Sequence, residues 1–149
     1  MIRDKLAEAT RDALRAQDKP LLSALRMVTS SVKNADIEAR GTGKGELSED
    51  ALLSLFQKLI KQRQESAEMY DKGGRPELAA GERAEIAVIQ SFMPKQMEEA
   101  DVAAAIDDAI RESGAASIKD MGKVMALLRQ RYAGRMDFAK VGGVLKGRL

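Results

Sequence analysis

Residues 119–149, which we call the basic segment, hold the side chains whose types and spacing best suit a chemical role. The segment contains 8 basic and 2 acidic residues, a net charge of +6, whereas residues 1–118 contain 17 basic and 21 acidic residues. Lysine and arginine gathered in this way bind phosphate groups, and such binding weakens as salt rises. The segment therefore predicts contact with a phosphate backbone. The candidate contact residues are Lys119, Gly122, Lys123, Arg129, Arg131, Arg135, Lys140, Lys146 and Arg148.

Gly122 lies near the start of the stretch KDMGKVMALLRQRY (119–132), which is otherwise patterned as a helix. Glycine inside a helix costs about 1 kcal/mol relative to alanine. One interpretation is that a phosphate approaches the first amides of this helix beside Lys123. The other interpretation, that a neighbouring helix packs closely over the glycine, is favoured because a capping Asp120 would compete with an anion.

The composition excludes several kinds of site. The chain has no histidine and no cysteine, so disulfides, thiolate metal sites and Ser-His or Cys-His catalytic pairs are excluded. No P-loop or metal-ligand motif is present. The carboxylates of residues 98–112 are expected to be solvated surface rather than a metal site. We therefore expect no metal, no cofactor and no catalysis by this chain alone.

The basic segment has a second interpretation as ordinary solvated helix surface. Its acidic residues, Asp120 and Asp137, both stand where helix caps are expected, so the remaining exposed charge is of one sign. Tyr132 and Phe138 are its only aromatic residues, and both are expected in the core, which favours recognition of a structured RNA through its backbone. The acidic helix of residues 99–113 could instead dock on the basic segment and mask it.

The elements that must position these residues are helices. The chain of 149 residues is 44% hydrophobic but only 3% aromatic, and apolar residues recur at helical spacing. We predict an all-α protein with a four-helix N-terminal domain (1–94) and a small three-helix C-terminal domain (95–149). The boundary is placed at Pro94 because proline disfavours helix at the preceding residue. Helix N-caps are expected at Asp18, Ser48, Asp120 and Asp137.

Two further expectations concern side chains inside the helices. Arg63 falls on the apolar stripe of the third helix and is expected to be partly buried, with a carboxylate such as Glu85 as its partner. Gly142 and Gly143 are expected to allow close packing of the last helix on the preceding one.

Three separated motifs resemble the GatB/YqeY family. The whole basic segment, KDMGKVMALLRQRYAGRMDFAKVGGVLKGRL, is similar to the C-terminal signature of that family. The stretches KQRQESAEMYDKGGRPELAAGERAEI (61–86) and FMPKQM (92–97) resemble its stand-alone YqeY branch. The resemblance covers essentially the whole chain. Departures from the family pattern occur at Phe92, Met93, Glu98 and Met136.

The resemblance implies a function in translation. The C-terminal part is similar to the tail domain of the GatB component of glutamine-dependent aminoacyl-tRNA amidotransferase, a helical appendage that touches tRNA, whereas the catalytic parts of that enzyme have no counterpart here. The implied RNA contacts fall on Gly122, Lys123, Gly134, Arg135 and Asp137. We therefore expect a non-catalytic, tRNA-interacting accessory protein, with an amidotransferase or another translation protein as a candidate partner.

Two other functions stay open. The family name suggests a participant in carbon–nitrogen ligation with glutamine as amido-N-donor, and the N-terminal helices could make the chain a protein-binding adaptor. Charged residues recur through the first 17 positions, and no apolar run approaches the roughly 18 residues of a membrane span. We expect a cytoplasmic location, no membrane partner, and RNA rather than DNA as the nucleic acid.

Overall fold

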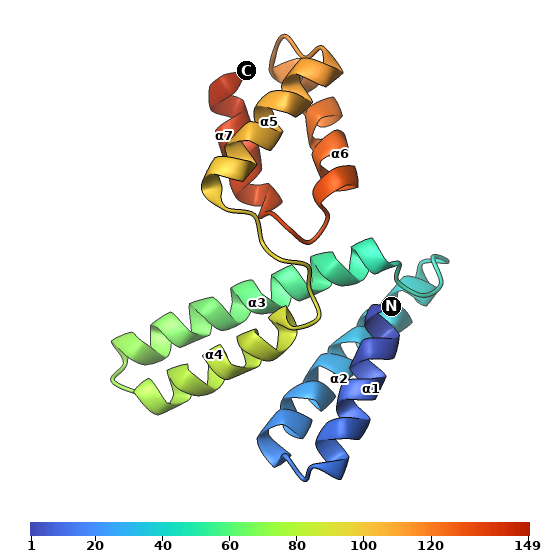
Figure 1. The fold of residues 1–149 in the computed structure, drawn as a ribbon, viewed down its shortest axis with the longest axis vertical. Coiled ribbons are helices and arrows are strands. Elements are labelled where there is room, and N and C mark those ends of the chain that lie inside the picture. The colour runs from blue at the N-terminus through green and yellow to red at the C-terminus, as the bar shows by residue number, and fades with distance from the viewer. The chain divides into compact units, whose positions relative to one another are not determined.

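The computed structural model describes residues 1–149 and contains seven α-helices, one short 3-10 turn and no strand (Figure 1). The prediction of an all-α protein is confirmed. The chain divides into two compact units, Met1–Met93 and Pro94–Leu149. None of the helices combines the length and apolar character that crossing a membrane requires.

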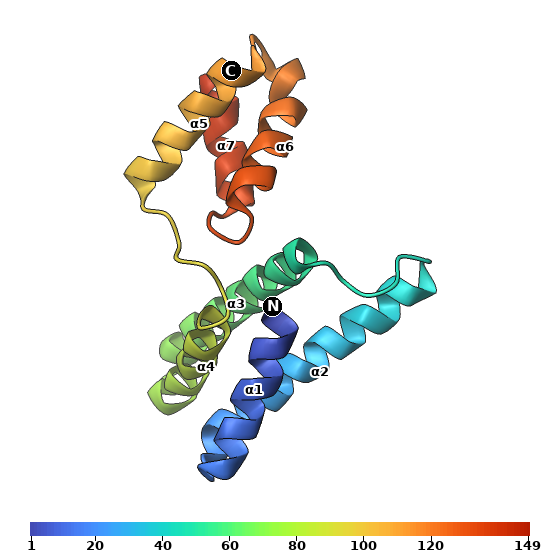
Figure 2. The same ribbon diagram turned by 45° about the vertical axis from the view of Figure 1, so that its right-hand side comes forward.

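The N-terminal unit is built from two helical hairpins. Helix α1 (Ile2–Arg15) pairs with α2 (Lys19–Gly41), and α3 (Glu49–Lys72) pairs with α4 (Pro76–Gln90), as Figure 2 shows. Aliphatic side chains and one phenylalanine fill the space between the helices. The largest fully buried side chains of this unit are Leu25, Val28, Leu52, Phe56 and Ile89.

Short polar side chains fix where several helices begin. The carboxylate of Asp18 accepts a hydrogen bond from the Leu21 N–H at 3.2 Å, and the Ser48 hydroxyl accepts one from the Ala51 N–H at 3.2 Å. In the C-terminal unit, Asp137 accepts from the N–H groups that open the last helix. Each of these bonds satisfies an amide that has no partner inside the helix, and the three cap predictions are confirmed.

Asp36 is a buried carboxylate that joins α1, α2 and the loop after α2. The Arg3 guanidinium donates to both of its oxygens at 2.8 Å, and the Leu47 N–H donates at 3.0 Å. The hydrogen bond from Arg3 and then the one from Leu47 lower the pKa of Asp36 to about 2, because both stabilise the charged form. This cluster of Arg3, Asp36 and Leu47, the Asp36 node, ties the N-terminal helix to the rest of its unit.

The side chain of Arg63, a residue of α3, is largely buried and paired with Glu85 of α4, as predicted. Its Nε atom donates to Oε2 of Glu85 at 2.9 Å, and its Nη1 atom donates to the Leu59 carbonyl at 3.1 Å. The Arg63 side chain is only 14% exposed. The apolar stem is therefore packed while the charged head is paired.

The C-terminal unit contains α5 (Glu99–Ser113), the 3-10 turn η1 (Ile118–Asp120), α6 (Met121–Tyr132) and α7 (Phe138–Arg148). Helices α6 and α7 run antiparallel (Figure 1). Helix α5 ends at Gly114, whose φ of +69° lies in the left-handed region that favours glycine. The largest fully buried side chains at the centre of the unit are Ile106, Val124, Leu128 and Leu145.

Candidate nucleic-acid interface

The apolar residues of α6 determine which of its side chains face outward. Val124, Met125 and Leu128 are buried. Because successive residues are turned by about 100° around a helix, the opposite side of α6 must carry the polar and small residues. The exposed side chains on that side are Gly122, Lys123, Ala126, Arg129 and Gln130.

Gly122 lies on open surface. A Cβ atom built at this position would meet no heavy atom within 4 Å, apart from its own helix backbone and its chain neighbours. Its φ is not in the left-handed region either, so backbone conformation does not require glycine. The expectation that a neighbouring helix packs over Gly122 is wrong, because no helix of the C-terminal unit comes that close. Together with Ala126, one turn later, Gly122 leaves a strip of the α6 backbone that no large side chain covers.

Asp120 does not cap α6 through its side chain, contrary to the prediction. The turn η1 runs directly into α6, which gives Asp120 a φ of −90° and a ψ of 1° instead of the extended conformation of most caps. Its carboxylate accepts a hydrogen bond from the Ala116 N–H at 3.0 Å, and this bond lowers its pKa. The Met121 N–H is donated to the Ile118 carbonyl. That amide is therefore not free to bind an anion.

Helix α7 adds a second outward face. Gly142 makes the expected contact with the preceding helix, because its Cβ would lie 3.5 Å from the Cε of Met121. Gly143 and Gly147 have no neighbour within 4 Å, so the packing prediction is wrong for Gly143. Small residues thus leave the backbone of α7 bare as well. The exposed residues of this helix are Ala139, Lys140, Gly143, Val144, Lys146, Gly147 and Arg148.

Apart from Arg135, the charged contact residues fall into two groups. Those of the first group form no ion pair with a carboxylate, although Asp120 acts electrostatically on Lys123. Arg129 stacks its guanidinium 5.7 Å from the centre of the Phe138 ring, a contact that holds the side chain without cancelling its charge. The lysines of this group form no ion pair and are exposed; they are Lys119, Lys123, Lys140 and Lys146.

The second group is engaged within the unit. Arg131 forms an ion pair with Glu112, and Arg148 forms one with Asp107. Both carboxylates belong to α5, so the alternative in which the acidic helix docks on the basic segment is realised at these two positions. Exposed pairs of this kind contribute roughly 0 to 1 kcal/mol. They reduce the positive charge that the unit offers to a polyanion.

Arg135 fastens the start of the unit to the loop between α6 and α7. Its Nε atom donates to the Lys95 carbonyl at 3.1 Å, and its own carbonyl accepts from the Met97 N–H at 3.0 Å. Gly134 turns this loop with a φ of +75°, and Asp137 caps α7. Among the contacts that the family resemblance implies, these three therefore have local structural roles, whereas Gly122 and Lys123 have none.

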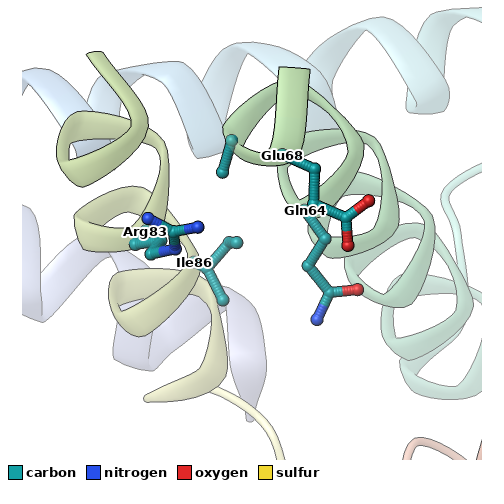
Figure 3. A pocket seen from close by; sticks show the side chains of 5 residues that line it. Gln64, Glu68, Arg83 and Ile86 are labelled. Atoms are coloured by element: carbon teal, nitrogen blue, oxygen red, sulfur yellow. The ribbon is translucent and has the colours of Figure 1, made fainter. Parts of the chain in front are cut away.

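A depression of about 310 Å³ lies between α3 and α4 in the N-terminal unit (Figure 3). Its apolar floor is Ala67 and Ile86, and its polar lining includes Arg83. Arg83 is paired with Asp71 at 2.5 Å, and the hydrogen bond within this pair raises the pKa of Arg83. The depression thus offers a ligand no unpaired cation. No group of three or more carboxylates in the structure is arranged to hold a metal ion.

Comparison with known proteins identifies relatives along nearly the whole chain. The family model described as Yqey-like protein matches residues 3–149. The chain is also similar to curated proteins named altered inheritance of mitochondria protein 41, mitochondrial. The one from Lachancea thermotolerans is 32% identical over 114 residues, which cover 73% of this chain and 59% of that protein.

Two further proteins of that name give similar values. The one from Vanderwaltozyma polyspora is 32% identical over 88 residues, covering 59% of this chain and 46% of that protein. The one from Pyrenophora tritici-repentis is 28% identical over 132 residues, covering 85% of this chain and 71% of that protein. The chain thus spans about half the length of the first two relatives. Their name places them in mitochondria, and the cytoplasmic location of this chain stays a prediction.

Proposed function

We propose, from the premise that the chain belongs to the Yqey-like protein family, that it is a non-catalytic, tRNA-interacting accessory protein linked to translation or to tRNA-dependent amidation. The C-terminal unit, acting as a tail domain, supplies the contact. We call its surface the tail face. It consists of the unpaired cations Lys119, Lys123, Arg129, Lys140 and Lys146 and the bare residues Gly122, Ala126, Gly143 and Gly147.

The observation that carries the proposal is the open position of Gly122 beside unpaired lysines. A glycine that neither the backbone nor internal packing requires lets another molecule approach the helix closely. Asp120 and Asp137 are the only acidic side chains of the basic segment; Asp120 accepts a backbone hydrogen bond from the loop before η1, and Asp137 accepts at the start of α7. Five cations thus face two carboxylates in this part of the chain, and an excess of positive charge suits a chain of phosphates.

The chemistry of the tail face favours a folded RNA read through its backbone. Lysine ammonium groups act as point charges toward phosphate oxygens and do not select a base. Tyr132 and Phe138 are half-buried and contact Arg135 and Arg129, so no exposed ring is available to stack on a single-stranded base. We therefore expect binding that depends on RNA shape and salt, with little dependence on sequence.

A salt titration of tRNA binding tests the proposal. The tail triple variant carries Lys123→Gln, Lys140→Gln and Lys146→Gln. The control, the α3 triple variant, carries Lys58→Gln, Lys61→Gln and Lys72→Gln, with the same loss of charge. Between 50 and 200 mM salt we expect the tail triple to reduce the slope of log affinity against log salt by about 2 to 3. The α3 triple should stay within about twofold of the parent affinity.

Equal behaviour of the two variants would show that tRNA binding does not use the tail face. Glutamine-dependent amidation of mischarged tRNA by the purified chain alone would establish the ligation alternative instead. Stoichiometric capture of one protein through residues 1–94, together with unchanged tRNA affinity after loss of the tail lysines, would establish the adaptor alternative.

A further inference from the structure

Helix α2 carries a row of cations at a spacing of seven residues. Lys19, Arg26, Lys33 and Arg40 follow one another at this interval, and all are exposed. Seven residues make nearly two turns of a helix, so these side chains project along one line. The line lies opposite the side that faces the core. The buried residues on that other side include Leu25, Val28, Val32 and Ala39. We call this line the α2 row.

Carboxylates neutralise only the end of the α2 row. Lys19, Arg26 and Lys33 form no ion pair, whereas Arg40 lies 3.6 Å from Glu46 in the following loop. Within α2 itself, Asp36 turns inward to Arg3. Glu38 is turned by roughly 140° to 160° around the helix from its row neighbours Lys33 and Arg40. Three unpaired cations therefore occupy one face without an acidic side chain among them.

Neighbouring helices do not share this feature. The exposed residues of α1 include Asp4, Lys5, Glu8, Arg11, Asp12 and Arg15, and those of α3 include Asp50, Lys58, Lys61, Glu65 and Glu68. Both helices thus mix the two signs of charge on their solvent faces, which is typical of solubilising surface. A single-signed face on α2 is not explained by solubility alone.

Neutral hydrogen-bonding groups stand between the cations. Ser23, Ser30 and Asn34 lie on the same face, are exposed, and have no hydrogen-bond partner in the chain. Lysine, arginine, serine and asparagine are side chains that contact phosphate and sugar groups of nucleic acids. The composition of the face thus matches a ribose–phosphate backbone in both charge and hydrogen bonding.

Other occupants fit this face less well. The apolar side of α2 is buried within its own unit, so the helix has no hydrophobic face to insert into a lipid surface. Ile37, 56% exposed, is the one large apolar side chain on the face. Tryptophan and tyrosine anchors, which dominate protein–protein interfaces, are missing from it.

We infer that the outer face of α2 binds the ribose–phosphate backbone of a folded RNA. At 1.5 Å of rise per residue, successive cations of the row stand about 10 Å apart, close to the Debye length at 0.1 M salt. Each cation therefore neutralises its own phosphate with little repulsion from the next. The inference shares its class of ligand with the proposed function but rests on another surface, in the N-terminal unit.

The test uses the full chain and a third triple variant, the α2 triple, with Lys19→Gln, Arg26→Gln and Lys33→Gln. The probes are tRNA and a 20-base-pair RNA duplex, and the control is the α3 triple variant with the same charge change. At 50 mM salt we expect the α2 triple to bind RNA roughly tenfold or more weakly than the parent chain. Its slope of log affinity against log salt should be smaller by about 2 to 3. Circular dichroism and thermal melting should show an unchanged fold in both variants.

A second pair of variants adds charge instead of removing it. Ser30→Glu places a carboxylate in the α2 row, and Ser54→Glu places one on the exposed face of α3. We expect only the first to weaken RNA binding, by several-fold. This pair keeps the inference testable if the α2 triple fails to fold, since both serines are exposed and free of side-chain hydrogen bonds.

Several outcomes would overturn the inference. Unchanged affinity of the α2 triple, or an equal loss in the α3 control, would show that the row makes no specific contact. Competition by polyglutamate as strong as that by RNA would indicate an acidic protein partner, and equally strong binding to phosphatidylserine vesicles would indicate a lipid surface. A tail triple with parental affinity beside a weakened α2 triple would reject the tail face as the tRNA contact while leaving this inference in place.

Discussion

Arg131 of α6 is ion-paired with Glu112 of α5, so one cation of the basic segment points toward an acidic helix rather than to solvent alone. The Arg131 side chain is 40% exposed and that of Glu112 is 51% exposed. At such exposure the pair contributes little to folding. Its main effect is on the charge that the C-terminal unit presents.

Neutralising the α5 partners should strengthen tRNA binding. The double variant Glu112→Gln with Asp107→Asn releases Arg131 and Arg148, and we expect affinity at 50 mM salt to rise several-fold with less than about 1 kcal/mol of change in stability. The control is Glu98→Gln with Asp101→Asn, which removes the same charge from unpaired positions. An equal rise in both double variants would attribute the effect to net charge rather than to released arginines.

Gly122→Ala should have opposite effects on stability and on binding. Because a Cβ meets nothing there, alanine should stabilise α6 by about 0.5 kcal/mol, while the added methyl group hinders close approach of RNA and lowers affinity. Gly81→Ala is the matched control, since Gly81 lies in α4 with equally open surroundings. Thermal melting and tRNA titration measure the two effects. A Gly122→Ala variant that is stabilised but binds normally would show that RNA does not contact this strip.

Asp36→Asn should destabilise the N-terminal unit. The substitution leaves the Arg3 guanidinium with a neutral partner that offers one acceptor oxygen instead of two, and we expect a loss of about 2 to 3 kcal/mol in the free energy of unfolding. Urea unfolding followed by circular dichroism measures it. Asp12→Asn, at an exposed and unpaired position, should change stability by less than about 0.5 kcal/mol. Similar stabilities of the two variants would contradict the importance of the Asp36 node.

Acid should weaken the same node. The pKa of Asp36 lies at about 2 in the folded chain, below its ordinary value of 3.8. A lowered pKa stabilises the fold above the unfolded-state value, and that stabilisation disappears as the pH falls from about 4 to about 2. We expect Asp36 to account for about 2 kcal/mol of the loss. In Asp36→Asn the free energy of unfolding should fall by that much less between about pH 4 and about pH 2. Urea unfolding at successive pH values measures this difference.

Features that depend on a single helix can be predicted from local signals in the sequence. A short side chain with an acceptor oxygen just before an apolar helical pattern almost always caps the helix N-terminus. This made Asp18, Ser48 and Asp137 predictable. Arg63 was predicted to pair with Glu85 because a long cation on an apolar stripe needs a carboxylate partner. Asp120 is the exception and does not cap α6 with its side chain, because the 3-10 turn before α6 gives it a different backbone conformation.

Features that depend on neighbouring elements were harder to predict. The pattern of α2 does not indicate that Asp36 is buried, because its partners lie on α1 and in the following loop. Gly122 and Gly143 resemble packing glycines, and only the positions of the other helices show that both are open. The α2 row is not evident from segment charge, because the acidic residues of 1–118 outnumber the basic ones and the net charge of a long segment conceals one single-signed face.

The Asp36 node also has a consequence for the order of folding events. It joins residues that are 33 and 44 positions apart, since Arg3 donates to Asp36 and to the Leu47 carbonyl at 3.0 Å. Closing so long a stretch of chain costs more conformational entropy than closing the short turn between α1 and α2. We expect the node to form after the transition state, so that Asp36→Asn accelerates unfolding and leaves the folding rate nearly unchanged. The node would then set how long the N-terminal helix stays attached, rather than how quickly the unit assembles.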